Sequence, residues 1–232
     1  MVKSKLILVS PGGLKGFYSF GILNYLRNNY QMNQYIYSGA SAGAWNCLLM
    51  CCNKDSFYVN NFVESLFEPM EKSKSICEIQ NIFKTKLLDS FSSSDFDFSR
   101  LYIGVTSLED KNISTDVYTK FTDLSDAIDC CMASSHIPLV TGGLVNKYRG
   151  KFSFDGGFSN YPYLKIPNKK PLVHIRPGMW EKNTKHKVYE LVEIVEGFSL
   201  EKNNMEQLYR KGFSDAEKNI SYFKHLGLKR KY

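Results

Sequence analysis

The N-terminal segment places a short apolar run directly before a glycine-containing turn and a second apolar-rich segment. Leu6–Val9 has the length and composition of a buried strand, and the turn Ser10–Gly16 (SPGGLKG) interrupts it. In Phe17–Asn28 the apolar residues recur at helical spacing. A strand, a glycine turn and a helix start together form a cradle of backbone N–H groups for negative charge. That charge is either a nucleotide phosphate that stays bound or an oxyanion that exists only during a reaction.

Strand-like and helix-like segments alternate through the first two thirds of the chain. This alternation predicts a single three-layer α/β/α domain with a mainly parallel central sheet and helices on both faces. We expect a motif-bearing core at 5–165, a C-terminal helical part at 186–232, and a surface loop, a candidate for mobility, at Ser90–Ser99. The expected strands are Leu6–Ser10, Gln34–Ser38, Leu101–Leu108, Asp116–Thr119, two pieces within Lys147–Phe154, and Pro171–Ile175. The expected helices are Phe17–Asn28, Ala42–Cys52, two or three within 57–91, Leu124–Ser134, Lys187–Val195 and Asn203–Leu226.

Composition excludes several classes of protein. The 232 residues are 43% hydrophobic and 14% aromatic, which is enough for one sizeable core. No apolar run approaches the roughly 20 residues of a membrane span, and the N-terminal run is too short for a signal peptide. The six cysteines include two adjacent pairs and no matched CxxC motifs, so neither disulfides nor a metal site is expected. We therefore expect an intracellular protein without a transmembrane segment. The net charge of +7 suits an anionic membrane face, but no nucleic-acid-binding motif accompanies it.

A second motif follows the next predicted strand. Gly39-Ala40-Ser41-Ala42-Gly43 is a G-x-S-x-G sequence between a strand and an apolar helix, which is the setting of a nucleophile elbow. The serine of such an elbow sits on a sharp, strained turn, so its neighbours must be small, and here all four are Gly or Ala. We therefore expect Ser41 to be a nucleophile, with Gly39 and Gly43 allowing the turn. The alternative is a tight strand–helix packing turn with an idle serine.

A nucleophilic serine needs a base, and histidine is the usual one. None of the four histidines, His136, His174, His186 and His225, lies in an obvious catalytic loop. A better candidate is Asp155, which ends a short predicted strand and precedes Gly156 and Gly157. Two glycines after an acid allow backbone or substrate to come close to it. The alternative is an ordinary loop aspartate, because Asp-Gly is a common turn pair.

Taken together, these motifs resemble the patatin-like phospholipase family in order and spacing. The resemblance covers residues 5–163 and rests on the glycine turn, the G-x-S-x-G motif and Asp155-Gly156-Gly157. Two further pieces support it, namely CMASSHIPLV at 131–140 and DGGFSNYP at 155–162. His136 falls on a variable position of the family pattern, where it is expected at most to line the pocket. Little after residue 165 matches the family.

The resemblance implies a Ser–Asp dyad in which Ser41 is the nucleophile and Asp155 the base. It also implies an oxyanion hole built from backbone N–H groups of the turn Gly12, Gly13, Leu14, Lys15 and Gly16, mainly those of Gly12 and Gly13. The family's most frequent form has three glycines at this turn, and this chain has Pro11 at the first of them. Proline has no N–H to donate, but the following two glycines are present. No metal or cofactor is implied.

The activity that the resemblance implies is hydrolysis of a fatty-acyl ester of a phospholipid or related glycerolipid, through an acyl-enzyme and at a membrane surface. Aromatic residues near the motifs are candidates for an acyl channel or for core packing, namely Phe17, Tyr18, Phe20, Tyr161 and Tyr163. Three alternatives stay open: a catalytically silent lipid- or protein-binding relative, a nucleotide-binding protein, and a Ser–His–Asp esterase. The nucleotide-binding alternative lacks G-x-G-x-x-G and the P-loop Gly-Lys-Ser/Thr. The sequence gives neither the lipid class nor the oligomeric state.

Overall fold

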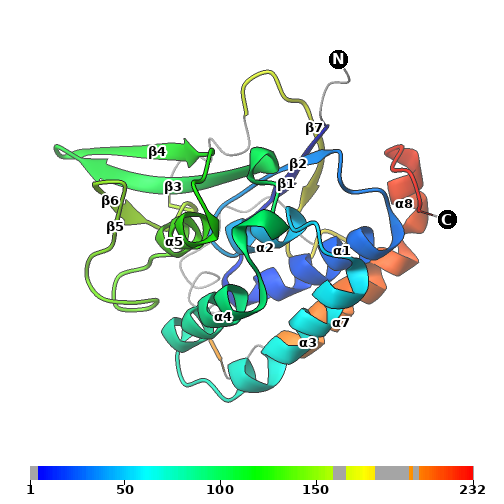
Figure 1. Ribbon diagram of the computed structural model, residues 1–232, viewed down its shortest axis with the longest axis horizontal. Helices are drawn as coiled ribbons and strands as arrows, with labels where there is room; N and C mark the ends of the chain where they lie inside the picture. The colour runs from blue at the N-terminus through cyan, green and yellow to red at the C-terminus, as the bar shows by residue number, and fades with distance from the viewer. Residues whose placement is uncertain (1–4, 159–165, 181–198, 201–203, 232) are drawn as a thin grey trace.

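A seven-stranded sheet organises the computed structural model, which describes residues 5–158, 166–180, 199–200 and 204–231. The strand order is β5-β6-β3-β2-β1-β7, and β4 also pairs with β3 (Figure 1). Four neighbouring strands, β3, β2, β1 and β7, are parallel, whereas β4 and β6 run antiparallel to β3. The strands are β1 Lys5–Val9, β2 Tyr35–Gly39, β3 Leu101–Glu109, β4 Asn112–Tyr118, β5 Lys147–Tyr148, β6 Lys151–Phe154 and β7 Pro171–Ile175. The predicted α/β fold with a mostly parallel sheet is therefore confirmed.

Helices follow the predicted order, and each begins directly after a polar residue. The described helices are α1 Gly16–Asn29, α2 Ala42–Met50, α3 Ser56–Glu71, α4 Ile76–Ser90, α5 Leu124–Ser134, α7 Met205–Lys218 and α8 Ile220–His225. Four of them begin after a side chain that accepts a backbone N–H of the first turn, a stabilising N-cap. These caps are Asp55, Ser75, Asp123 and Asn204. The helix expected at Lys187–Val195 lies outside the described residues. No helix in the described part of the chain has the length and apolarity to cross a membrane.

Alternation along β1 separates two apolar clusters. Ile7 and Val9 belong to the large core that contains the helices, whereas Leu6 and Leu8 belong to a small cluster on the opposite face with Ile36 and Ile166. Side chains that alternate along a strand point to opposite faces of the sheet. Both faces of β1 are therefore covered, which is why its four apolar residues follow one another without a polar break.

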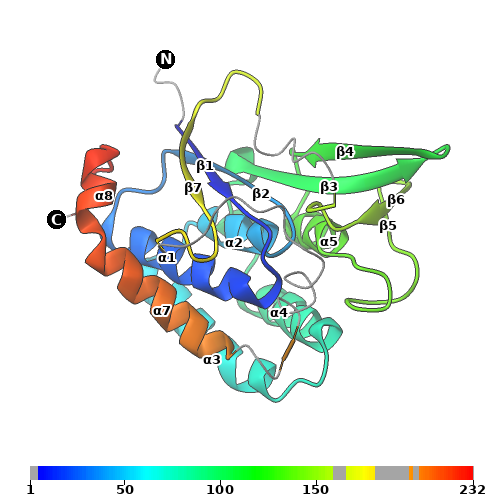
Figure 2. The same ribbon diagram turned by 180° about the vertical axis from the view of Figure 1, so that it is seen from behind.

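Helices α1 and α7 lie side by side although they are far apart in the sequence (Figure 2). Two glycines allow this close approach. A Cβ at Gly21 would lie 2.0 Å from the carbonyl oxygen of Tyr209, and one at Gly212 would lie 1.9 Å from that of Tyr18. These contacts are with backbone atoms, which cannot rotate away. The C-terminal helix α7 is thus part of the same core as the motif-bearing α1.

The segment Ser90–Ser99, expected as a surface loop, combines exposed serines with short turns and buried aromatic rings. Two short 3₁₀ turns, Ser93–Asp95 and Phe98–Arg100, give the segment regular structure. Phe91 and Phe96 are buried, and their rings meet edge to face at 5.5 Å between centroids. The serines and aspartates that suggested a loop instead hold the turns through short-range hydrogen bonds.

Candidate active site

Ser41 lies between β2 and α2, in a backbone conformation that non-glycine residues rarely adopt. Its φ is 55° and its ψ is −131°, and it is the N-cap residue of α2. A Cβ at Gly39 would lie 2.6 Å from the carbonyl oxygen of Gly43, and one at Gly43 would lie 2.4 Å from that of Val9. Both glycines of the motif are therefore required by backbone atoms that pass close by. Strain of this kind is typical of functional turns.

Ser134 holds the serine turn in place. Its Oγ accepts the Ser41 N–H at 2.8 Å and donates to the Gly104 carbonyl oxygen at 2.7 Å, so one fully buried hydroxyl ties the turn to β3. Next to it, the Ser135 Oγ accepts the indole N–H of Trp45 at 3.1 Å. Neither serine was predicted from the sequence to support the site. The one sequence feature that pointed to them was the segment 131–140, which lies between the serine and aspartate motifs and supports the family resemblance.

Asp155 is placed at the end of β6 by backbone hydrogen bonds. Its N–H donates to the carbonyl oxygen of His136 at 2.7 Å, and its carbonyl oxygen accepts the Thr106 hydroxyl at 2.8 Å. A Cβ at Gly156 would lie 2.1 Å from the Gly104 carbonyl oxygen. The glycine after the acid therefore lets this turn sit directly on β3, beside the serine turn.

The structure brings Ser41 and Asp155 together as the motifs predicted. Both are buried, the Asp155 carboxylate accepts the Gly157 N–H at 2.7 Å, and the Ser41 side chain lies close enough to act on the pKa of that carboxylate. Burial raises the pKa of Asp155 to about 6, although the Ser41 side chain and the Gly157 N–H both act to lower it. Among the described residues no histidine is hydrogen-bonded to Ser41, and His186 lies outside them. A carboxylate with this pKa is a stronger base than an ordinary aspartate.

The glycine turn packs directly against the serine turn. A Cβ at Gly16 would lie 2.4 Å from the Ala42 Cβ, and the Asn46 side chain donates to the Gly16 carbonyl oxygen at 3.1 Å. Gly13–Lys15 form a 3₁₀ turn, with Gly13 at a φ of 50°. The Gly12 and Gly13 N–H groups precede the first hydrogen bond of this turn, and neither has a protein acceptor among the described residues. A turn whose N–H groups have no protein acceptor is suited to hold a negative charge.

An apolar cavity of about 70 Å³ opens at Ser41. The glycine turn, α1, α2 and α4 form its walls. Phe17 and Phe20 line it as expected, whereas Tyr18 instead donates its hydroxyl to Asp215 at 2.8 Å. Tyr161 and Tyr163 lie outside the described residues. The α4 side of the wall was not predicted from the sequence and consists of Ile76, Ile79, Gln80 and Phe83.

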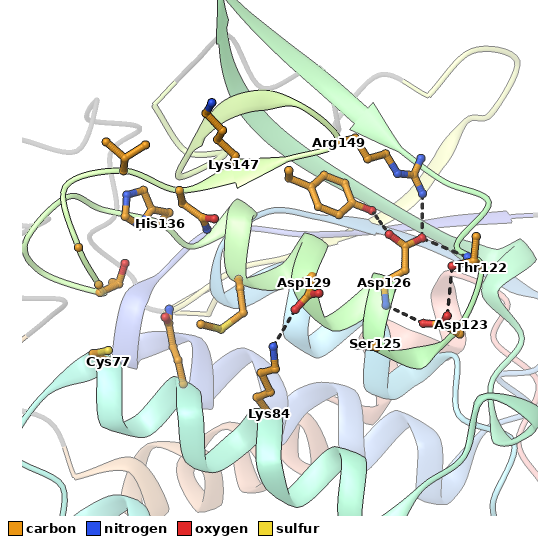
Figure 3. Close-up of a pocket in the computed structure, with 18 of the residues that line it drawn as sticks. Cys77, Lys84, Thr122, Asp123, Ser125, Asp126, Asp129, His136, Lys147 and Arg149 are labelled. Carbon is orange, nitrogen blue, oxygen red and sulfur yellow. Dashed lines mark hydrogen bonds and ion pairs between the residues drawn. The ribbon is translucent and has the colours of Figure 1, made fainter.

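A larger open groove of about 1010 Å³ lies between α4, α5 and the segment that leads to β5 (Figure 3). Gln80 lines both this groove and the cavity at Ser41, so the two are neighbours. Two acids in the groove are paired, Asp126 with Arg149 at 2.9 Å and Asp129 with Lys84 at 2.8 Å. A third acid, Asp123, is the N-cap of α5.

His136 also lines the groove, in agreement with the limited role expected for it. Its ring is buried, and the Nε2 atom has no hydrogen-bond partner in the described structure. Burial lowers the pKa of His136. Its backbone carbonyl oxygen accepts the Asp155 N–H at 2.7 Å, so His136 contacts the acid turn through its main chain.

The mixed α/β fold and the strained serine between a strand and a helix place this chain among α/β proteins with a nucleophile-elbow turn. A family model described as patatin-like phospholipase matches residues 8–165, which is more than half of the chain. The chain belongs to the patatin-like phospholipase family.

Comparison with curated proteins finds no match. Among solved structures, VipD from Legionella pneumophila is similar, with a TM-score of 0.38 and 13% sequence identity. The alignment covers 67% of this chain and 46% of VipD, so this chain spans less than half of that protein's length.

Proposed function

We propose that this protein is a lipid acyl hydrolase that uses Ser41 as nucleophile and Asp155 as general base, without a metal. The observation that carries the proposal is the placement of a serine on a strained turn beside a buried carboxylate whose pKa is raised to about 6. The expected substrates are fatty-acyl esters of a phospholipid, lysophospholipid or neutral glycerolipid. The apolar cavity beside Ser41 supports an acyl group as the part of the substrate held there.

The reaction begins when Asp155 takes the Ser41 proton as Oγ attacks the ester carbonyl carbon. The carbonyl oxygen becomes an oxyanion, which the N–H groups of Gly12 and Gly13 stabilise. One such donor is worth roughly 3 kcal/mol in a serine protease. The predicted donor Gly16 is not available for this, because its N–H donates to the carbonyl oxygens of Gly13 and Leu14 within the turn. The C–O bond to the alcohol then breaks, and the Asp155 proton goes to the departing alcohol oxygen. This leaves an acyl ester on Ser41.

Water completes the reaction. Asp155, again ionised, takes a proton from a water molecule that attacks the acyl-enzyme, and the same amides stabilise the second oxyanion. The fatty acid leaves, and Ser41 regains its proton. Because one carboxylate serves as base in both halves, the proposal needs no histidine. The strain at Ser41 presents Oγ to the cavity and keeps it beside the carboxylate.

We further propose that the enzyme works inside the cell, on lipid at a membrane surface. All six cysteines are free thiols, and five of them are buried, which suits a reducing compartment. The net charge of +7 suits an anionic lipid surface.

A fluorophosphonate probe tests the nucleophile directly. We expect the native protein to be labelled at Ser41, and we expect Ser41→Ala to be unlabelled and inactive on a panel of phospholipid, lysophospholipid and triacylglycerol substrates. Asp155→Asn should lose hydrolysis while remaining folded. A matched control is Ser94→Ala on the surface, which should keep full activity. Labelling that persists in Ser41→Ala would refute the assignment, and a folded native protein that neither reacts nor hydrolyses would favour a silent lipid- or protein-binding relative.

A further inference from the structure

The connection between α5 and β5 exposes an unusual set of aliphatic side chains. Leu139, Val140, Leu144 and Val145 are 76%, 41%, 67% and 59% exposed, all within seven residues of one loop. Figure 1 shows this connection reaching outward at the edge of the molecule. Single exposed apolar residues are ordinary, but a contiguous group of them marks a binding surface. We call residues 137–146 the apolar loop.

Hydrogen bonds hold the apolar loop in a fixed shape. The buried Thr141 hydroxyl accepts the Ile137 N–H at 2.8 Å and donates to the Ser135 carbonyl oxygen at 2.9 Å, while the Val140 N–H donates to the Ile137 carbonyl oxygen at 3.0 Å. Leu139, at the tip, has a φ of 65°, a conformation that is unfavourable for leucine. The loop therefore presents its most exposed side chain at an energetic cost, which points to a function for that side chain.

The apolar loop begins at the Ser–Asp pair. His136, directly before it, accepts the Asp155 N–H through its carbonyl oxygen, and Ser135 accepts the indole N–H of Trp45 in the cavity wall. The loop then forms one side of the open groove, with Val145 and Lys147 in its lining (Figure 3). A surface that receives this loop would thus lie beside the entrance to the candidate active site.

Positive charge borders the apolar loop. Lys147 and Lys120 line the groove, and neither forms an ion pair within the described part of the chain, whereas Lys84 and Arg149 are paired with Asp129 and Asp126. The Lys147 Nζ lies 4.6 Å from the ring centre of Phe152, a further partly exposed apolar side chain. Aliphatic side chains bordered by unpaired cations match the boundary between acyl chains and anionic headgroups.

We propose that the apolar loop docks the protein on an anionic lipid bilayer, with Leu139 and Leu144 entering the acyl region and Lys147 contacting headgroups. This docking site rests on the proposed function, because it serves a hydrolase whose substrate lies in that bilayer. A protein partner fits the loop less well. Protein hot spots are enriched in Trp, Tyr and Arg and depleted in Leu and Val, whereas the exposed side chains here are Leu and Val.

Vesicle co-sedimentation of the Ser41→Ala protein tests the docking without hydrolysis. The two vesicle types are pure phosphatidylcholine and phosphatidylcholine with about 30% phosphatidylserine. We expect binding to the anionic vesicles to fall roughly tenfold or more in Leu139→Ser/Leu144→Ser, because two apolar side chains no longer enter the bilayer. Phe57→Ser is the matched control, since Phe57 is 74% exposed at the start of α3, and it should bind like the parent protein. Lys147→Gln should weaken binding to the anionic vesicles alone.

Hydrolysis of a water-soluble short-chain ester separates the two proposals. With Ser41 intact, the double leucine variant should keep this activity while losing activity on vesicles. Vesicle binding through the loop by a protein that hydrolyses nothing would retain the docking site and refute the proposed function. The docking site would be refuted if the protein were an active esterase that binds neither vesicle type. It would also be refuted if Phe57→Ser lost as much vesicle binding as the loop variant.

Discussion

The buried carboxylate of Asp155 should destabilise the folded protein at the pH at which it acts. Asp155→Asn replaces this carboxylate with an uncharged group of the same shape. The amide oxygen can still accept the Gly157 N–H, which the carboxylate accepts at 2.7 Å. The substitution therefore removes the buried charge and little else. We expect it to abolish hydrolysis and at the same time to raise the free energy of unfolding.

The magnitude follows from the two pKa values. The pKa of Asp155 is 3.8 in the reference state and is raised to about 6 by burial in the folded protein. Between these pH values the folded protein keeps a proton that the unfolded chain has lost, so stability falls as the pH rises from 3.8 to about 6. A shift of about two pKa units corresponds to about 3 kcal/mol, at 1.36 kcal/mol per unit. The whole penalty is present above about pH 6 and absent below pH 3.8.

Urea unfolding followed by circular dichroism measures this difference. At about pH 8, above both pKa values, Asp155→Asn should be more stable than the native protein by up to about 3 kcal/mol, and its advantage should shrink as the pH falls toward the reference value. As a control, Asp129→Asn removes a half-exposed carboxylate paired with Lys84. It should change the free energy of unfolding by less than about 1 kcal/mol, both at about pH 8 and in acid. An Asp155→Asn protein that is no more stable at about pH 8, or whose advantage is equally large in acid, would refute the reasoning.

Three further predictions concern activity and packing. First, kcat/KM on a soluble ester should fall about tenfold per pH unit below about pH 6, because Asp155 must be ionised to act as base; a midpoint near its reference pKa of 3.8 would contradict this. Second, Gly156→Ala should lower the melting temperature by several degrees or prevent folding, because its Cβ would lie 2.1 Å from the Gly104 carbonyl oxygen. The control Gly143→Ala has open space at its Cβ and should melt at the native temperature, so equal melting temperatures for the two variants would contradict this prediction. Third, Phe83→Ala should enlarge the cavity of about 70 Å³ and so raise the ratio of kcat/KM for the octanoyl p-nitrophenyl ester to kcat/KM for the butyryl ester. If this ratio does not change, the cavity does not hold the acyl chain.

Local sequence determined the elements that carry the chemistry. The strand β1, the glycine turn, the serine turn and Asp155-Gly156-Gly157 all lie where the sequence predicted them, and Leu124–Ser134 and Pro171–Ile175 match their predicted ranges. These elements could be predicted because their signals depend on only a few neighbouring residues. The signals are short apolar runs, helical periodicity and glycines at tight turns, and none of them requires knowledge of the fold.

Residues that act through distant contacts could not be found in this way. The Ser134 hydroxyl supports Ser41 across 93 positions of the chain, and its neighbours give no sign of that contact. The composition of the serine-rich segment Ser90–Ser99 suggested a mobile surface loop and gave no sign that Phe91 and Phe96 are buried in it. Whether such a residue is buried in the core depends on how the helices and strands pack together and not on its neighbours in the sequence.

The glycine turn illustrates the division most clearly. The sequence alone predicted that Ser10–Gly16 offers backbone N–H groups to a negative charge, because a strand, glycines and a helix start occur there in order. The tertiary structure decided which neighbours that turn has: Ala42 packs against Gly16, and the cavity that Gly13 lines is also lined by Ser41. The pKa of Asp155 was decided in the same way, because a carboxylate is desolvated only when segments distant in the chain close around it.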